Sequence, residues 1–167
     1  LRIFGSSQDI TERKKAEHAL RSNEERLKLA LQAAGAGTWD WHIPSGDMEW
    51  SPEIERMLGV RDGVRPPSFG SFLDRVHPSD RKRVAETMTD AMDRAGSYET
   101  EFRVLGNDQI EGWVLAKGKA LRNGKPLRML GVFVDVTTRH QAHEALRDLG
   151  GRLIHAHEEE RIRLSQE

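Results

Sequence analysis

Residues 131–146 read GVFVDVTTRHQAHEAL, and a diverged copy of the same segment, GSSQDITERKKAEHAL, occupies residues 5–20. The two copies lie 126 positions apart (131 − 5). A repeat with a period of domain size is typical of tandem modules. The sequence therefore predicts the end of one module followed by one complete module, cut from a longer, repetitive protein. The identical pairs are Gly5/Gly131, Asp9/Asp135, Thr11/Thr137, Arg13/Arg139, Ala16/Ala142, Ala19/Ala145 and Leu20/Leu146.

The repeat also sets the predicted boundaries of the modules. Because residues 1–4 align with residues 127–130, which read as a strand, the chain is expected to open on the last strand of a preceding module. The predicted organisation is that strand at residues 1–10, a connecting helix at 11–34, the complete module at 35–138 and an exit helix at 139–167.

Composition excludes several classes of function. The chain has 26 basic and 27 acidic residues and a net charge of −1, which gives no basic field for nucleic acid. It has no cysteine, which excludes disulfides, cysteine-ligated zinc and a cysteinyl–flavin adduct. No apolar run approaches the roughly 20 residues that a membrane span requires. A cytoplasmic location and no membrane span in this fragment are expected.

The connecting helix at residues 11–34 carries one apolar seam. Its members follow heptad spacing, with Asn23 in the gap between two leucines, an arrangement that favours pairing with a second helix. The alternative is an amphipathic helix lying on its own domain. The seam residues are Ala16, Leu20, Leu27, Ala30 and Ala34.

Residues 35–138 alternate between short strands and short helices. Strands are predicted at 38–43, 48–51, 98–105, 110–121 and 127–136. Helices are predicted to begin at Ser51-Pro52, with Ser51 as the N-cap, at Ser68 and at Pro78. Trp39 and Trp41 should lie on one face of the first strand. Turns are expected at Asn107-Asp108 and Asn123-Gly124. The layout is α+β with an antiparallel sheet.

Short segments spread over the module carry a family pattern, and they are Gly37-Thr38-Trp39-Asp40-Trp41, Glu49-Trp50-Ser51-Pro52, Leu58-Gly59, Val76-His77-Pro78-Ser79-Asp80-Arg81, Glu101-Phe102-Arg103, Trp113 and Gly131 with Asp135-Val136-Thr137. In these segments the chain resembles a PAS domain, of the bacterial subclass with paired tryptophans in the first strand. The resemblance implies a five-stranded antiparallel sheet of order 2-1-5-4-3, short helices on one face, and long N- and C-terminal helices. The chain departs from the family at His42, where the family often has an acidic residue, and at Asn107-Asp108-Gln109, where the family often has an Asp-Gly turn and a basic residue.

The last residues, EEERIRLSQE at 158–167, resemble the segment that precedes the phosphoacceptor histidine in one class of sensor histidine kinases. The alternative is an ordinary charged helix. The resemblance implies a parent kinase, a response regulator as its partner and a homodimer formed through the terminal helices. The fragment itself is expected to have no enzymatic activity. Its function would be a sensory or relay module; the alternatives are a ligand-free dimerisation spacer and a haem- or flavin-binding gas or redox sensor.

Three residues at the start of the exit helix are the best candidates for coupling domain to helix: Asp135, Thr137 and Arg139. Asp or Thr at this place can cap the first helical turn. By the resemblance, Asp135 and Arg139 would also form a salt bridge. The same triplet recurs at Asp9, Thr11 and Arg13.

A ligand pocket is the second candidate, although its residues would be needed simply as core. No metal site is predicted, and His140 and His143 are interpreted as solvated helix residues. His77 is interpreted as capping the helix that begins at Pro78, with haem ligation as the alternative; any other small ligand is unidentified. The candidate pocket residues are Trp39, Met57, Leu58, Phe72, Leu73, His77, Phe102, Trp113 and Phe133.

Overall fold

The computed structural model describes residues 6–60, 67–105 and 111–164. In these residues the helices are α1 (Ser6–Ala33), α2 (Pro52–Met57), α3 (Phe69–Arg75), α4 (Pro78–Arg94) and α5 (Thr137–Leu164). The strands are β1 (Ala36–His42), β2 (Met48–Trp50), β3 (Ser97–Leu105), β4 (Glu111–Asn123) and β5 (Lys125–Asp135). The α+β layout follows the prediction, with strand ends differing by a few residues.

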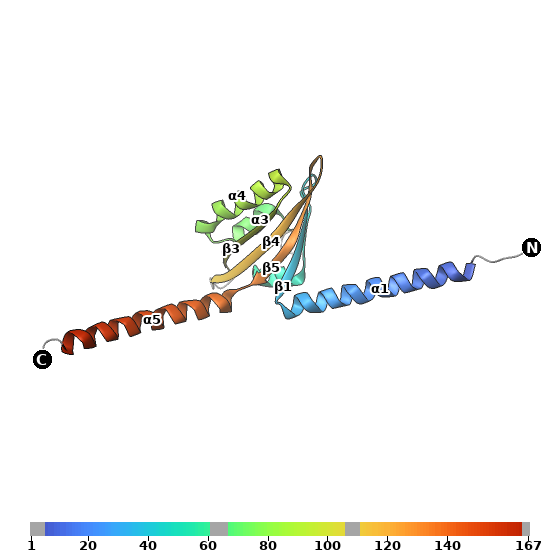
Figure 1. Ribbon diagram of the computed structural model, residues 1–167. Coiled ribbons are helices and arrows are strands. Elements are labelled where there is room, and N and C mark those ends of the chain that lie inside the picture. The colour runs from blue at the N-terminus through green and yellow to red at the C-terminus, as the bar shows by residue number, and fades with distance from the viewer. Residues whose placement is uncertain (1–5, 61–66, 106–110, 165–167) are drawn as a thin grey trace, which may run out of the picture.

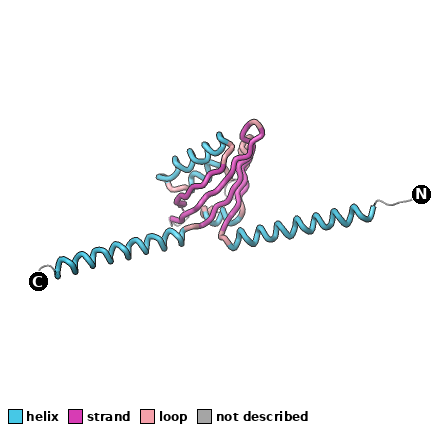
Figure 2. The backbone as a smooth tube through the Cα atoms, viewed as in Figure 1, coloured by secondary structure: helices cyan, strands magenta, loops and turns pink. Residues whose placement is uncertain are grey.

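The strands form one sheet (Figure 2). It is antiparallel, and its order β2-β1-β5-β4-β3 confirms the predicted topology. Strand β5 pairs with β1 at one edge and with β4 at the other, which suits its nearly continuous apolar sequence. Gly124, between β4 and β5, has a φ of 76°, a left-handed value that glycine adopts without steric cost. The predicted Asn123-Gly124 turn is therefore confirmed, whereas Asn107-Asp108 lies outside the described residues.

Helices α2, α3 and α4 cover one face of the sheet, and the core lies between these layers (Figure 1). On β1, Trp39 and Trp41 both face this core, as the alternation predicted. Both layers contribute side chains that are almost completely removed from water, and such burial is the main favourable term in folding. The largest of them are Phe102, Ile54, Leu58, Met88, Met129, Val76, Val84 and Val114.

Two glycines on neighbouring strands make room for the first tryptophan. Gly118 on β4 is paired with Gly131 on β5, which in turn is paired with Trp39 on β1. A Cβ atom at Gly131 would lie 2.1 Å from the Lys117 carbonyl oxygen and 2.8 Å from the Trp39 indole. A Cβ atom at Gly118 would lie 2.5 Å from the Tyr98 ring. The indole and the phenol ring, with centroids 6.3 Å apart, occupy the space above the glycines.

A side-chain cap begins α3 but not α2. Ser68 begins α3 with a capping box, in which its Oγ accepts from the Ser71 amide at 3.1 Å and Ser71 Oγ accepts from the Ser68 amide at 2.9 Å. The prediction that Ser51 caps α2 is wrong for its side chain. Ser51 Oγ instead accepts from the Thr38 amide at 3.0 Å, because the residue also continues the ladder between β2 and β1.

Helices α1 and α5 extend away from the sheet on opposite sides (Figure 1). Helix α1 begins at Ser6, so residues 6–10 are helical and not part of the strand predicted at residues 1–10. Residues 1–4, predicted as the core of that strand, lie outside the described residues. Among the described helices, none combines the length and apolar character that a membrane crossing requires.

Candidate functional site

The turn from β5 into α5 is fixed by two side chains. Asp135 Oδ1 accepts a hydrogen bond from the Thr137 amide at 2.9 Å, which satisfies one of the donors that a helix N-terminus leaves unpaired. Thr137 Oγ1 accepts from the Trp113 amide at 2.9 Å, and the Val136 amide donates to the Trp113 carbonyl at 2.8 Å. The predicted cap is present, and Thr137 also joins the helix to β4.

Arg139 makes a different ion pair from the one the resemblance implied. Its guanidinium donates to the carboxylate of Glu101 on β3, so the expected salt bridge with Asp135 is absent. The physical reason is that Asp135 turns its carboxylate to the Thr137 amide, while Glu101 lies on the edge strand beside the first turn of α5. Arg139 therefore joins α5 to β3.

His140 binds the same carboxylate and is not the solvated histidine that was predicted. Its Nε2 lies 2.8 Å from Glu101 Oε2, and its side chain is only 27% exposed. A carboxylate only accepts hydrogen bonds, so Nε2 carries the proton in this contact. Hydrogen bonds from His140, and then from Arg139, hold the pKa of Glu101 below its ordinary value.

Trp113 lies on the opposite face of the sheet from the candidate pocket, which corrects its inclusion there. Its neighbour Val114 is buried in the core, so the alternation along β4 turns Trp113 outward. There its ring stacks on the His140 imidazole, with centroids 3.9 Å apart and planes 8° from parallel. The Arg103 guanidinium lies 5.8 Å from the centroid of the indole.

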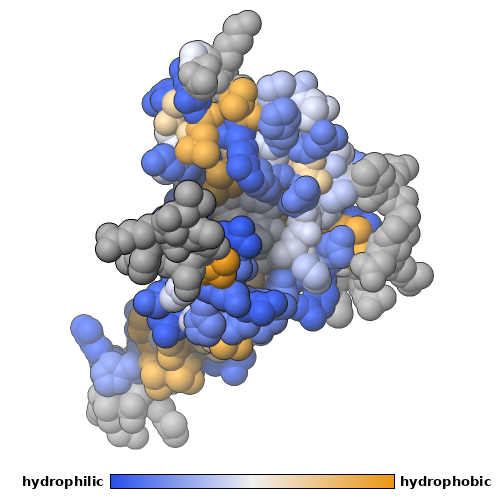
Figure 3. All heavy atoms as spheres, turned by 90° about the vertical axis from the view of Figure 1, so that its right-hand side faces the viewer, coloured by the Kyte–Doolittle hydropathy of each residue, from blue (hydrophilic) through white to orange (hydrophobic). Residues whose placement is uncertain are grey.

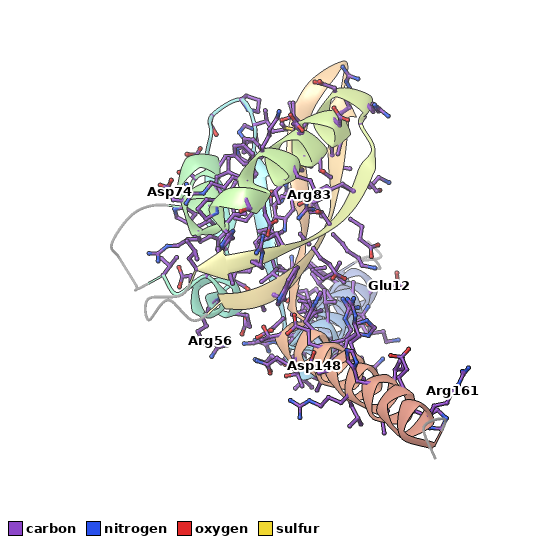
Figure 4. The ribbon with its side chains drawn as sticks, turned by 90° about the vertical axis from the view of Figure 1, so that its left-hand side faces the viewer. Glu12, Arg56, Asp74, Arg83, Asp148 and Arg161 are labelled. Carbon is purple, nitrogen blue, oxygen red and sulfur yellow. The ribbon has the colours of Figure 1, made fainter. Side chains whose placement is uncertain are left out.

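Arg103 connects this cluster to α4. Its side chain forms two hydrogen bonds with Asp80 in the first turn of α4, at 3.0 and 3.2 Å, and its amide forms a third at 3.0 Å. The hydrogen bonds from Arg103 outweigh the effect of burial and lower the pKa of Asp80 to about 2. Arg83, on α4, points toward β3 and donates to Thr100 Oγ1 at 2.7 Å and to the Glu101 carbonyl at 2.8 Å (Figure 4).

The residues that hold the start of α5 to the sheet form what we call the junction cluster: Glu101, Trp113, Asp135, Thr137, Arg139 and His140. The cluster contains no arrangement of nucleophile and base. Its carboxylates, guanidinium, imidazole and indole are held in fixed contacts, so the cluster can hold α5 at a set angle. Through Arg103 it also connects α5 to α4.

The sequence identified half of this cluster. Asp135, Thr137 and Arg139 were found through the repeat, and the structure brings them together. Glu101, Trp113 and His140 were missed as members. The available indication was the run of small side chains at Val114, Ala116, Gly118 and Ala120, which fixes the inward face of β4 and leaves Trp113 on the other.

The other predicted pocket residues lie on the core side of the sheet. Trp39, Leu58, Phe72, Phe102 and Phe133 are buried, and Met57 and Leu73 are partly buried against them. The centroid of the Phe133 ring lies 5.4 Å from that of Phe72, 5.8 Å from that of Phe102 and 6.0 Å from that of Trp39. The rings thus pack against one another, as a core requires.

Within the described residues, three buried polar atoms of this region have no hydrogen-bond partner: Trp39 Nε1, Trp41 Nε1 and Tyr98 Oη. Burial raises the pKa of the Tyr98 phenol, which therefore stays neutral. Unpaired buried polar atoms are rare in folded proteins and call for an explanation such as a bound water or ligand. All three can donate, so a hydrogen-bond acceptor is the group that would satisfy them.

His77 caps α4. Its Nδ1 accepts from the Ser79 amide at 3.2 Å, and Pro78 occupies the first helical position. The predicted cap is thus present. In the described parts of the chain, no three His, Asp or Glu side chains gather as a metal site requires.

Comparison with known proteins yields one family and several relatives. Residues 47–133 match the family described as the PAS fold. The sensor protein FixL of Bradyrhizobium diazoefficiens is 30% identical over 125 residues, which cover 74% of this chain and 25% of that protein. The probable diguanylate cyclase DgcE of Escherichia coli is 26% identical over 147 residues, covering 87% of this chain and 13% of that protein. The chain thus spans a quarter or less of the length of these relatives.

A solved structure is similar over most of the chain. It is a sensory box histidine kinase/response regulator from Burkholderia thailandensis, 32% identical, with a TM-score of 0.65. The match covers 78% of this chain and 98% of that one.

Proposed function

The chain belongs to the PAS family, and on that premise we propose that it is a sensory and relay module of a sensor histidine kinase. In this proposal a change in the core or in α1 alters the pose of α5, and α5 carries that change to the output domain. The observation that carries the proposal is the junction cluster, because it links α5 to β3, β4 and, through Arg103, to α4. A stimulus can shift such a pose only by its different affinity for the two states.

The two long helices are proposed to pair with those of a second copy. Leu20 and Leu27 are each 61% exposed, so α1 does not bury its seam against its own domain. On α5, Leu146, Leu149 and Leu153 are also more than half exposed. Exposed leucines at such spacing are stable in water when a partner helix covers them.

The seams of α1 and α5 have the same register. Shifting Leu20 and Leu27 by the 126-residue repeat gives Leu146 and Leu153, and the position of Asn23 becomes Leu149. Both seams therefore stand at the same distance from a threonine of the repeat, which is Thr11 within α1 and Thr137 at the start of α5. This match supports a relay, because a rotation or shift entering at one helix pair would leave at the other in the same phase.

The output is proposed to be a histidine kinase on the strength of residues 158–167, which resemble the segment before a phosphoacceptor histidine. Similar proteins include a probable diguanylate cyclase as well as histidine kinases, so modules of this kind serve more than one output. The test gives the full-length protein radiolabelled ATP in one reaction and radiolabelled GTP in a parallel one. Autophosphorylation from ATP is expected; cyclic diguanylate formed from GTP, without autophosphorylation from ATP, would assign a cyclase instead.

The same assay tests the relay. His140→Ala should change the rate of autophosphorylation, whereas His143→Ala, an exposed histidine on the same helix, should not. Equal rates in the wild type and in both variants would mean that the chain is a ligand-free dimerisation spacer.

Ligand sensing in the core is a second candidate, favoured by the unpaired donors of Trp39, Trp41 and Tyr98. The ligand would be apolar in its body and would carry a hydrogen-bond acceptor. A haem- or flavin-binding sensor is the alternative, and such a protein would absorb visible light. Because His77 Nδ1 accepts from the Ser79 amide as a helix cap, we do not expect His77 to ligate haem, and the purified protein is expected to be colourless. A Soret band that disappears in His77→Ala would assign haem.

A further inference from the structure

Four charged side chains of alternating sign lie between the end of α1 and the start of α5. Lys28 of α1 lines a groove of about 610 Å³ together with Glu53 and Arg56 of α2. Glu53 and Arg56 also line a neighbouring cleft of about 420 Å³, and so does Asp135, the residue that caps α5. From α1 to α5 the signs run positive, negative, positive, negative. We call Lys28, Glu53, Arg56 and Asp135 the charge row.

The sheet brings the end of α1 and the start of α5 to one place. Ala36, just after α1, pairs with Val134 in the ladder between β1 and β5. Gly35, which ends α1 with a φ of 60°, lines the same cleft as Asp135. Helix α2 is fixed beside this point, because its Ile54 is completely buried in the core. A charge on α2 therefore stands close to both long helices.

Glu53 is the centre of the row, since cations of α1 and α2 both act on it. Its carboxylate pairs with the Arg56 guanidinium at 3.1 Å, and its side chain is only 22% exposed. Hydrogen bonds from its own amide and from the Ser51 hydroxyl, and the charges of Arg56 and Lys28, hold the pKa of this carboxyl below its ordinary value. Lys28 and Arg56 thus compete for one carboxylate.

Arg56 has a second carboxylate within the same cleft. Its side chain is 73% exposed, and ion pairs in water are weak enough for a guanidinium to change partner at little cost. Asp135 holds the Thr137 amide through Oδ1. A guanidinium that binds Asp135 draws this carboxylate from the amide and neutralises the negative charge that favours a helix N-terminus. Seen from the side of α1, most of the surface is hydrophilic, with apolar side chains in patches within it (Figure 3).

We propose that the charge row carries the position of α1 to the cap of α5 through a change of partner by Arg56. While Lys28 stands off, Glu53 holds Arg56 and Asp135 caps α5. When α1 brings Lys28 onto Glu53, Arg56 is released to Asp135 and the first turn of α5 loosens. The inference rests on the proposed relay and gives that relay a path along the surface, outside the core.

The test is the hydrogen exchange rate of the Thr137 amide, measured by NMR on the whole chain, because this amide donates to Asp135. Glu53→Gln should release Arg56 and accelerate the exchange about threefold, an effect of the size of one exposed ion pair. Glu86→Gln is the matched control. It breaks an exposed ion pair with Lys82 on α4, away from the row, and should exchange as the wild type does.

A double variant separates the change of partner from a general loosening of α2. In Glu53→Gln/Arg56→Gln no guanidinium is left to compete for Asp135, so the exchange should return to the rate of Arg56→Gln alone. Acceleration that persists in the double variant would overturn the inference, because the cap would then weaken without Arg56.

The α1 end of the row has its own variant. In Lys28→Gln, Glu53 always keeps Arg56, so Thr137 should exchange more slowly than in the wild type. The same change should have no effect when Arg56→Gln is already present. Lys15→Gln, an exposed lysine elsewhere on α1, is the control. Equal slowing by Lys28→Gln with and without Arg56 would contradict the row.

Failure of the row and failure of the relay give different results. If His140→Ala changes autophosphorylation of the full-length protein while Glu53→Gln exchanges as the wild type does, the relay stands and the inference is overturned. If the exchange pattern holds while His140→Ala leaves autophosphorylation unchanged, the charge row is supported and the proposed relay is wrong.

Discussion

His140 of helix α5 stacks on Trp113 of strand β4, with centroids 3.9 Å apart and the planes 8° from parallel. The same imidazole binds Glu101 of β3 through Nε2. One side chain thus contacts two strands and fixes the rotation of α5 about its axis. An exit helix held only by its cap would lack this restraint, because a cap orients the first turn and leaves later side chains free.

Acid should destabilise the domain through Asp80. The pKa of Asp80 in the folded protein is about 2, below the ordinary value of 3.8. The carboxylate therefore contributes fully to the free energy of unfolding at pH values above 3.8, and this contribution is lost as the pH falls through about 2. The difference between the two pKa values corresponds to about 2 kcal/mol of stability. Urea unfolding of the wild type at pH 6, 4 and 2 should show this loss, and Asp80→Asn should largely remove it. Asp90→Asn, in an exposed pair with Arg94, is the control. The same acid slope in Asp80→Asn as in the wild type would contradict the assignment.

Replacing glycine by alanine should have opposite effects in the sheet and in α5. Gly131→Ala would place a Cβ 2.1 Å from a backbone oxygen, which the sheet cannot accommodate without moving, and should cost about 3 kcal/mol or more. Gly150→Ala/Gly151→Ala meets no neighbouring atom within 4 Å and should raise the stability of α5 by about 1 kcal/mol per site. Thermal melts test the first, and helix content by circular dichroism tests the second. A Gly131→Ala protein as stable as the wild type would contradict the close approach of Gly131 to the Lys117 carbonyl and the Trp39 indole.

Double-mutant cycles should separate the partners of Arg139. Asp135→Ala removes a cap and should cost about 1 kcal/mol, and Arg139→Ala removes an exposed ion pair worth at most about 1 kcal/mol. Because Arg139 binds Glu101, the Asp135/Arg139 cycle should be additive within about 0.5 kcal/mol, whereas the Glu101/Arg139 cycle should show coupling. The free energies of unfolding in urea measure both cycles. Coupling between Asp135 and Arg139, with additivity between Glu101 and Arg139, would mean that Arg139 pairs with Asp135 instead.

The sequence predicted most of the fold because its local patterns are strong. Alternation around Trp39 and Trp41, the Asn123-Gly124 turn and the Pro78 helix start each specify structure within a few residues. The repeat drew attention to the junction, where Asp135 caps the helix that begins at Thr137, whereas the equivalent Asp9 lies inside α1. The order of strands came from the family resemblance and not from these patterns.

What the sequence missed depends on which strands become neighbours. Glu101 and Arg139 are 38 residues apart and meet only because β3 and α5 both lie beside β4. Trp113 was placed among the pocket or core residues because it is apolar, although an aromatic side chain can equally cover the other face of a sheet when a histidine stacks on it. Ser51 was predicted to cap α2 because of its residue type and its place before Pro52. Its Oγ instead accepts a hydrogen bond from the Thr38 amide on β1.

The most direct test of the account is hydrogen–deuterium exchange in the first turns of α5, where the His140 amide donates to the Val136 carbonyl. In His140→Ala, the amides from residue 140 to 144 should exchange about tenfold faster than in the wild type, the equivalent of a lost contact of about 1.4 kcal/mol. His143→Ala carries the same change of residue at an exposed position and should exchange as the wild type does. Unchanged exchange in His140→Ala, or equal acceleration in both variants, would contradict the claim that His140 holds the exit helix to the sheet.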